Sequence, residues 1–130
     1  DHLDALSVAI KTNEDITRIF KTLVLLNEKK EMIVACIPGL EKLDLKKLAK
    51  ISGSKKVEML PMKDLFSMTG YLRGGCSPIA IKKRHTAFIH NSATDNETIL
   101  ISGGLRGLQI EISPQKLIDY LNLKVADIIE

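Results

Sequence analysis

The chain has 130 residues, of which 45% are hydrophobic and 27% charged, with 8 Gly and 4 Pro. This composition is typical of one globular domain and excludes a disordered or fibrous chain. No segment approaches the ~20 consecutive apolar residues of a membrane helix and no signal peptide is visible, so we expect a cytoplasmic protein with no membrane partner. The formal net charge of +3 favours an anionic partner, while the aromatic content of 4% argues against a base-stacking platform for single-stranded nucleic acid.

The first half of the chain alternates apolar runs with charged turns. An apolar cluster at residues 6–10 predicts a short helix. Residues 19–26 are apolar on both faces apart from Lys21, which predicts a central strand. A charged turn at residues 27–31 then leads into a returning strand at residues 32–37, and the two strands are expected to pair antiparallel.

The middle of the chain predicts two helices around a short strand. Asp44 is a credible N-cap for a helix that ends at Gly53 and turns its lysines to solvent. A short strand is expected at residues 56–60, and Pro61 is suited to the first turn of a helix that continues to residue 68. A glycine-rich loop follows that helix.

The last third of the chain predicts strands at residues 86–90, 97–102 and 107–112. Ser113 and Pro114 open a helix, and residues 125–129 form a last strand or helix. Helices and strands therefore mix without regular alternation or repeats. We expect an α+β fold with a mixed or antiparallel sheet.

Lys21 is the first candidate for chemistry. A lysine inside an apolar strand loses hydration and must find a partner, lose its proton or reach water through a cavity. Snorkelling of the four-carbon stem to the sheet edge is the commoner outcome. Its place in the strand nevertheless suits Lys21, better than any other lysine of the chain, to point into a pocket.

Two glycine loops are the second feature. Residues 70–78 read GYLRGGCSP, and residues 102–107 read SGGLRG after a predicted strand. Glycine-rich loops present backbone N–H groups to an oxyanion or phosphate, although each loop could equally be a tight connector. Neither has the spacing of a Walker A loop or a dinucleotide fingerprint.

A cysteine nucleophile and a metal site are weakly supported. Cys76 would need a nearby base, and His85 and His90 belong to a separate predicted strand. The two histidines are five positions apart, on opposite faces of a strand, and no cysteine pair has zinc-site spacing. We expect no metal and no cofactor.

Five segments of the sequence together resemble the YbaK/ProX family of aminoacyl-tRNA editing domains. They are residues 20–23 (FKTL), 43–47 (LDLKK), 55–59 (KKVEM), 69–78 (TGYLRGGCSP) and 102–108 (SGGLRGL), in the family's order and spacing. The resemblance runs from about residue 6 to the end of the chain. It implies one editing domain over residues 1–130 without its amino-terminal segment, built on a mixed, barrel-like sheet with flanking helices.

The resemblance also implies an activity, which is cleavage in trans of the aminoacyl ester of mischarged tRNA. YbaK-type members act on cysteine attached to proline tRNA, without a metal, by chemistry in which the thiol of the bound cysteine attacks its own ester. Lys21, Gly74 and Gln109 match catalytic-site positions. The expected substrate-binding residues are Thr22, Gly70, Gly75, Ser77, Pro78, Ser102, Gly103 and Gly104. The expected partners are the acceptor end of mischarged tRNA and, transiently, prolyl-tRNA synthetase.

One departure from the family bears on specificity. YbaK-type deacylases commonly carry an aspartate after the Arg-Gly-Leu block, where this chain has Gln109. An amide forms hydrogen bonds but cannot act as a base or hold an ammonium by charge. Three alternatives therefore stay open: a deacylase for another small amino acid such as alanine, a noncatalytic tRNA- or nucleotide-binding module, and a small-molecule esterase that uses Cys76.

Overall fold

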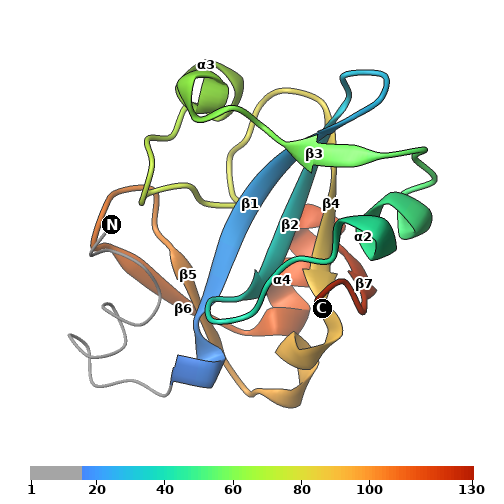
Figure 1. The fold of residues 1–130 in the computed structure, drawn as a ribbon. Helices are drawn as coiled ribbons and strands as arrows, with labels where there is room; N and C mark the ends of the chain where they lie inside the picture. The colour runs from blue at the N-terminus through green and yellow to red at the C-terminus, as the bar shows by residue number, and fades with distance from the viewer. Residues whose placement is uncertain (1–15) are drawn as a thin grey trace.

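The computed structural model describes residues 16–130, so the helix expected at residues 6–10 lies outside the described residues. Its centre is a five-stranded sheet in the order β3-β1-β2-β4-β7, beside a two-stranded sheet of β5 and β6 (Figure 1). The strands are β1 (Phe20–Asn27), β2 (Met32–Pro38), β3 (Val57–Met59), β4 (His85–His90), β5 (Ile99–Ser102), β6 (Gln109–Ile112) and β7 (Lys124–Ala126). The helices are α2 (Leu45–Ile51), α3 (Leu65–Thr69) and α4 (Pro114–Leu121), with short 3-10 turns η1 (Ile16–Arg18), η2 (Met62–Asp64) and η3 (Asn91–Asp95).

The sheet is mixed, as expected. β1 runs antiparallel to both β2 and β3, whereas β2 is parallel to β4 and β4 to β7. The charged turn closes the β1–β2 hairpin because the Asn27 side-chain oxygen accepts the N–H groups of Lys29 and Glu31, each at 2.9 Å. The α+β class, the hairpin and the flanking helices are thus confirmed.

The sheet does not close into a barrel. It ends at β3 and β7, and β3 pairs only with Leu25–Asn27 at the far end of β1. An isolated bridge joins Ile19, the residue before β1, to Leu100 of β5. Because β3 is three residues long, the first five residues of β1 pair with no described strand on that outer edge. β2, not β1, is the buried central strand, with its first six residues buried.

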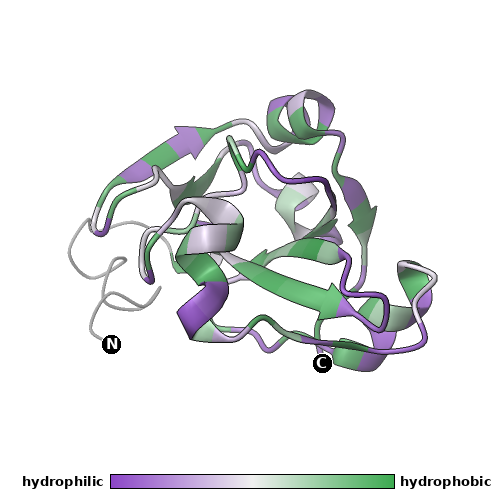
Figure 2. Cartoon of the chain, turned by 90° about the horizontal axis from the view of Figure 1, so that it is seen from above, coloured by the Kyte–Doolittle hydropathy of each residue, from purple (hydrophilic) through white to green (hydrophobic). Residues whose placement is uncertain are grey.

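Two apolar layers hold the sheet between helices. On one face, Leu48 and Ala49 of α2 pack against Phe88 of β4. On the other face, Leu117 of α4 joins a cluster with Val34 of β2. Hydrophobic residues accordingly concentrate along the strands (Figure 2). Of the described residues, none lies in a helix long and apolar enough to cross a membrane.

One expected element differs in detail. The helix expected from Pro61 to residue 68 is a 3-10 turn followed by the five-residue α3, which is capped by Gly70 with φ +82°. The Thr69 hydroxyl donates to the Leu65 carbonyl at 2.7 Å in the last turn of α3. At the carboxyl end, where a strand or a helix was expected, Lys124–Ala126 form the strand β7.

Candidate active-site pocket

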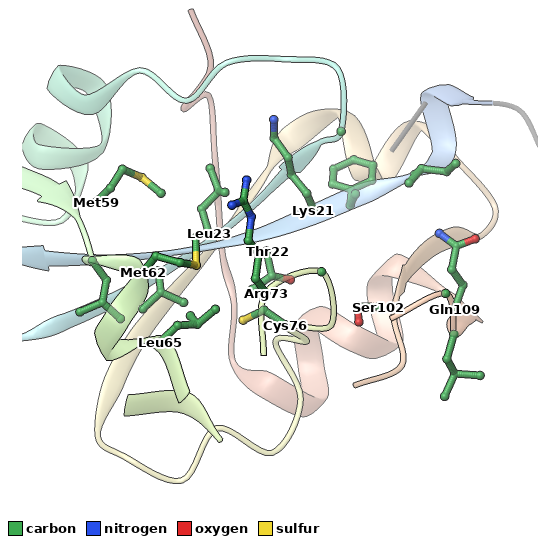
Figure 3. Close-up of a pocket in the computed structure, with 18 residues that line it drawn as sticks. Lys21, Thr22, Leu23, Met59, Met62, Leu65, Arg73, Cys76, Ser102 and Gln109 are labelled. Carbon is green, nitrogen blue, oxygen red and sulfur yellow. The ribbon is translucent and has the colours of Figure 1, made fainter. Parts of the chain in front are cut away.

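A pocket of about 320 Å³ lies along the amino-terminal half of β1. Its walls come from β1, from the segment between β3 and α3, and from the two glycine loops (Figure 3). Ile19 and the first five residues of β1, from 20 to 24, line it. A strand can line a cavity with successive residues only where the cavity runs beside its edge, so the pocket occupies the gap between β3 and β5.

One wall of the pocket is apolar and adaptable. Leu23, Met59, Met62 and Leu65 line it, and Figure 3 shows their side chains gathered on one side. Met59 and Met62 remain about half exposed, at 47% and 55%. Methionine side chains are flexible and polarizable, so this wall can adjust to the flat or aliphatic part of a ligand.

The ionisable side chains of the pocket are two cations and a thiol. Lys21 of β1 and Arg73 of the first glycine loop line it, together with Cys76. No Asp, Glu or His lines the pocket within residues 16–130. The site can therefore attract anions and stabilise developing negative charge, and it contains no described protein group suited to act as a general base.

Gln109 brings an unsatisfied acceptor to the site. It lines the pocket, and its Oε1 is buried without a hydrogen-bond donor among the described residues. A buried acceptor left without a donor costs roughly 1–3 kcal/mol, so such atoms are rare unless a ligand or water satisfies them. Gln109 is therefore poised to receive a hydrogen bond from a bound ligand.

Cys76 is a poor nucleophile. Burial raises the pKa of its thiol to about 11, and a hydrogen bond with Thr69 offsets only part of that rise. Cys36, fully buried on β2, has its pKa raised by burial to about 12, with a contact of 3.9 Å to the Thr22 hydroxyl. Both thiols stay protonated at neutral pH, which favours a packing role.

Five of the expected site residues line the pocket. They are Lys21, Thr22, Gly74, Ser102 and Gln109. Gly74 must be glycine, since its φ is +85° and an added Cβ would lie 3.1 Å from Nε of Arg106. Residues from a strand and from two distant loops thus meet at one cavity.

The other expected substrate-binding residues lie behind this lining and support it. Three are glycines packed between the loops. A Cβ on Gly75 would lie 3.2 Å from the Gly104 carbonyl, one on Gly103 would lie 2.8 Å from Leu108, and one on Gly104 would lie 3.1 Å from Tyr71. Side chains at Gly75 and Gly104 would push the two loops apart, and one at Gly103 would displace Leu108 of its own loop.

The remaining three shape the first loop. Gly70 ends α3 in a left-handed conformation, and Pro78 is buried. Ser77 is 2% exposed, and its hydroxyl accepts the Ile79 N–H at 3.2 Å. The Tyr71 hydroxyl donates to the Ile79 carbonyl. These contacts fix the course of the loop that carries Gly74.

Sequence reasoning missed the apolar wall and gave no role to Arg73. Met59 and Met62 lie on either side of a short strand end and a proline, and a short apolar run gives no sign of facing a cavity. Arg73 lies inside the glycine motif, which was the one available signal. The sequence leaves a Cys76 nucleophile open but gives it little support, and the raised pKa of that thiol argues against it.

Comparison with known proteins identifies the family. A model of the aminoacyl-tRNA editing domain matches residues 3–120. The chain is 50% identical over 128 residues to the "Putative Cys-tRNA(Pro)/Cys-tRNA(Cys) deacylase EbsC" of Enterococcus faecalis, a match that covers 98% of this chain and 78% of that protein.

Solved structures share the fold. The crystal structure of a hypothetical protein matches with a TM-score of 0.92 over 98% of this chain and 85% of that chain, at 23% identity. A structure described as "a putative trans-editing enzyme for prolyl tRNA synthetase" matches with a TM-score of 0.87 over 97% of this chain and 79% of that chain, at 22% identity. The predicted resemblance is confirmed, and the chain belongs to the aminoacyl-tRNA editing domain family.

Proposed function

We propose that this protein is a trans-acting deacylase that cleaves the aminoacyl ester of mischarged tRNA, with cysteinyl-tRNA(Pro) as its main substrate. The observation that carries the proposal is the 50% identity, across 98% of the chain, to a relative named as a Cys-tRNA(Pro)/Cys-tRNA(Cys) deacylase. At that identity and coverage, the pocket walls described above derive from a shared fold. The chemistry of the pocket supports the same reaction.

Lys21 is the proposed catalytic residue. Attack on an ester carbonyl places negative charge on the carbonyl oxygen, and a fixed cation at the cavity stabilises that charge more than it stabilises the neutral ester. Gly74 allows the ester to approach the backbone closely, since no side chain stands in the way. Arg73 adds a second positive charge, suited to the phosphates of the acceptor end.

The cleavage step needs no protein nucleophile when the substrate is a cysteinyl ester. The thiol of the bound cysteine attacks its own ester carbonyl, a carbon–sulfur bond forms, and the carbon–oxygen bond to the ribose breaks. The thiol proton ends on the departing ribose oxygen, so the products are free tRNA and a cyclic thioester of cysteine. The enzyme then contributes positioning and charge stabilisation, which suits a pocket with no described carboxylate or imidazole.

Gln109 is proposed to hold the amino group of the substrate. Its buried Oε1 has no donor among the described residues, and the ammonium of an aminoacyl ester is a strong donor. This contact would satisfy the acceptor and orient the amino acid without a formal negative charge.

The esterase alternative is disfavoured. A Cys76 nucleophile would need a thiolate, yet burial raises the pKa of that thiol to about 11. Of the described residues that line the pocket, none is a histidine able to remove the proton. Since the substrate is a tRNA, the proposed location is the cytoplasm and the proposed transient partner is prolyl-tRNA synthetase.

The test is a deacylation panel on cysteinyl-, alanyl- and prolyl-tRNA(Pro). We expect fast release from the cysteinyl substrate, slower release from the alanyl substrate and little from the cognate prolyl substrate. Trapping of a cyclic thioester product identifies attack by the substrate thiol. Binding of all three tRNAs without release from any would instead establish a noncatalytic binding module.

A further inference from the structure

Basic side chains gather at one end of the five-stranded sheet, where three segments meet. These segments, here together called the cationic end, are the β1–β2 turn (28–31), the start of β3 (55–58) and the approach to β4 (82–84). Seven basic and three acidic side chains give the cationic end a net charge of +4, against +3 for the whole chain. The basic residues, all exposed, are Lys29, Lys30, Lys55, Lys56, Lys82, Lys83 and Arg84.

Strand pairing brings the three segments together. The Lys55 N–H donates to the Glu28 carboxylate at 3.0 Å, which joins the start of β3 to the turn. Met32 of β2 pairs with His85 of β4, so Arg84 lies beside the same turn. The segments therefore follow one another across four adjacent strands, β3, β1, β2 and β4 (Figure 1). At about 4.8 Å per strand, the cationic end is about 15 Å wide.

The basic groups of the cationic end have no acidic partner in the fold. Within residues 16–130, none of the seven forms a salt bridge. The acidic Glu31 accepts the Asn27 side-chain amide at 2.9 Å instead. Lys47 of α2 differs, because it binds Asp127 at 3.1 Å. A run of charge is usually only a solvated face, so the position of the cationic end relative to the pocket decides its meaning.

The cationic end adjoins the pocket through β3. Met59, the last residue of β3, lines the pocket, and Lys55 lies four residues before it. At about 3.3 Å per residue of strand, the two are about 13 Å apart. The unpaired 3′ end of tRNA is a few nucleotides long. An aminoacyl end bound in the pocket therefore leaves the paired acceptor stem within reach of the cationic end.

We propose that the cationic end binds the phosphate backbone of the tRNA acceptor stem while the pocket holds the aminoacyl end. This inference rests on the proposed function and assigns the surface that receives the body of the substrate. Lysines bind phosphates as point charges, and such contacts position a nucleic acid without reading its sequence. They contribute affinity that falls as salt rises. The cationic end thus acts on substrate binding and not on the cleavage step.

The composition of the cationic end favours RNA over a protein or a membrane. Its only hydrophobic residue, Val57, is buried, and it contains no aromatic residue. The centres of protein interfaces are depleted of lysine and depend on aromatic or aliphatic anchors, and membrane-surface helices bury an apolar face. Double-stranded RNA is recognised mainly through its phosphates and 2′-hydroxyls. A surface of exposed lysines without stacking residues is complementary to a paired stem.

The experiment compares two pairs of exposed lysines. Lys55→Gln with Lys83→Gln removes two charges from the cationic end. The matched control, Lys42→Gln with Lys116→Gln, removes the same charge before α2 and on α4. Fluorescence anisotropy measures the affinity of each protein for uncharged tRNA(Pro) and for a microhelix of its acceptor stem, over a series of salt concentrations.

We expect the first pair to lower both affinities about 10-fold or more near 0.1 M salt, and to reduce the salt slope by about two. The control pair should stay within about 2-fold of wild type. Unchanged affinity in the first pair, or an equal loss in both pairs, would overturn the inference. So would normal tRNA binding combined with lost binding of prolyl-tRNA synthetase, because the surface would then belong to a protein partner. If the first pair does not fold, Lys30→Gln with Arg84→Gln takes its place.

Cleavage assays separate the inference from the proposed function. The first pair should raise KM for cysteinyl-tRNA(Pro) about 10-fold and leave kcat unchanged, since it weakens binding before the reaction. KM for a cysteinyl ester of the unpaired 3′ fragment should not change. Weakened tRNA binding by the first pair, in a protein whose wild type deacylates no tRNA, would support the surface and refute the enzyme. Deacylation by wild type with the same KM in the first pair would support the enzyme and refute the surface.

Discussion

Two regions of the molecule gather polar side chains around a cavity. They differ in whether the hydrogen-bonding groups of those regions already have partners within the protein. One is the pocket beside β1. The other, here called the His90 cluster, consists of His90, Ser92, Asp127 and Lys47 where β4, α2 and the carboxyl-terminal segment meet. A cavity of about 340 Å³ lies beside it and is lined by His90 and Ser92.

The His90 cluster has the residue types of a serine hydrolase, but its atoms are engaged. His90 Nδ1 lies 2.8 Å from the Ser92 hydroxyl and also accepts the Ser92 N–H at 3.1 Å, which caps η3. Nε2 lies 3.4 Å from Asp127. Lys47 binds the same carboxylate at 3.1 Å, and this hydrogen bond is the main cause that lowers the pKa of Asp127.

The comparison shows that residue type is a weaker guide to a site than unfulfilled hydrogen-bonding capacity. The ring nitrogen that would have to take a proton from Ser92 is already occupied by a backbone N–H, so the cluster holds the fold together. The pocket has no described histidine or carboxylate, yet it holds an acceptor without a donor at Gln109 and an open strand edge at Thr22. Ligand recognition requires a region like the pocket, where hydrogen-bonding groups still lack partners.

The sharpest test of the comparison exchanges a lysine in each region. Lys21→Ala should lower deacylation at least about 100-fold, because it removes the cation that stabilises the oxyanion. Its melting temperature should stay near that of the wild type, since Lys21 is only partly buried. The measurement is single-turnover release of cysteine from tRNA(Pro), with thermal unfolding in parallel.

Lys47→Ala is the matched control. It removes a lysine that binds Asp127 and the Ile129 carbonyl far from the pocket. We expect unchanged turnover and a small loss of stability, since exposed ion pairs contribute less than about 1 kcal/mol. Turnover near wild type in folded Lys21→Ala would end the catalytic assignment.

Gln109→Asp sharpens the account of specificity. A carboxylate in place of the amide would pair with the substrate ammonium by charge, and we expect cysteinyl-tRNA(Pro) cleavage to gain about 1–3 kcal/mol, roughly 5- to 150-fold in kcat/KM. Gln109→Leu removes the acceptor and should lower kcat/KM instead. If Gln109→Asp has no effect or lowers the rate, the ammonium is held elsewhere and the preference for cysteine must be reassigned.

His90→Ala tests the other region. It removes the acceptor that caps η3 and the contact with Asp127, so we expect the free energy of unfolding to fall by about 1–3 kcal/mol in urea titrations. Turnover should stay within about 2-fold, because the cluster takes no part in the reaction. A folded His90→Ala protein with turnover lost would show that the comparison assigns the wrong region to catalysis.

Much of the fold could be predicted from local patterns. The β1–β2 hairpin follows from two apolar runs around a charged turn, and α2 begins where Asp44 accepts the Lys47 N–H at 3.0 Å. Barrel closure came from the resemblance and not from the residues. Sheet closure depends on how far edge strands extend, and the three residues of β3 leave the edge of β1 open.

The site residues that stand out in the local sequence could be predicted. Those whose role depends on how distant segments pack together could not. Lys21 and the glycine loops stand out in the sequence as a charge among apolar residues and as rare glycine density. The pocket wall of Met59 and Met62 depends on β3 ending early, which no periodicity shows. The unpartnered Gln109 oxygen is likewise a property of the packed molecule, since an amide in a strand usually finds a donor.

Cys76→Ala should have the smallest effect, although Cys76 lines the same pocket as Lys21. Burial raises the pKa of the Cys76 thiol from 9.0 to about 11, so the thiol is uncharged at neutral pH, and turnover of the alanine variant should stay within about 3-fold of wild type.

The raised pKa of the Cys76 thiol also predicts a pH effect on stability. From pH 9 to about 11 the unfolded chain releases this proton while the folded chain keeps it, so the free energy of unfolding should fall as pH rises through that window. Cys76→Ala should flatten this fall without abolishing it, because Cys36 acts in the same direction up to about pH 12. Urea titrations between pH 8 and 12 measure the slope. A folded Cys76→Ala protein with negligible turnover would make the thiol part of the reaction, and the pocket would then work by a nucleophile of its own.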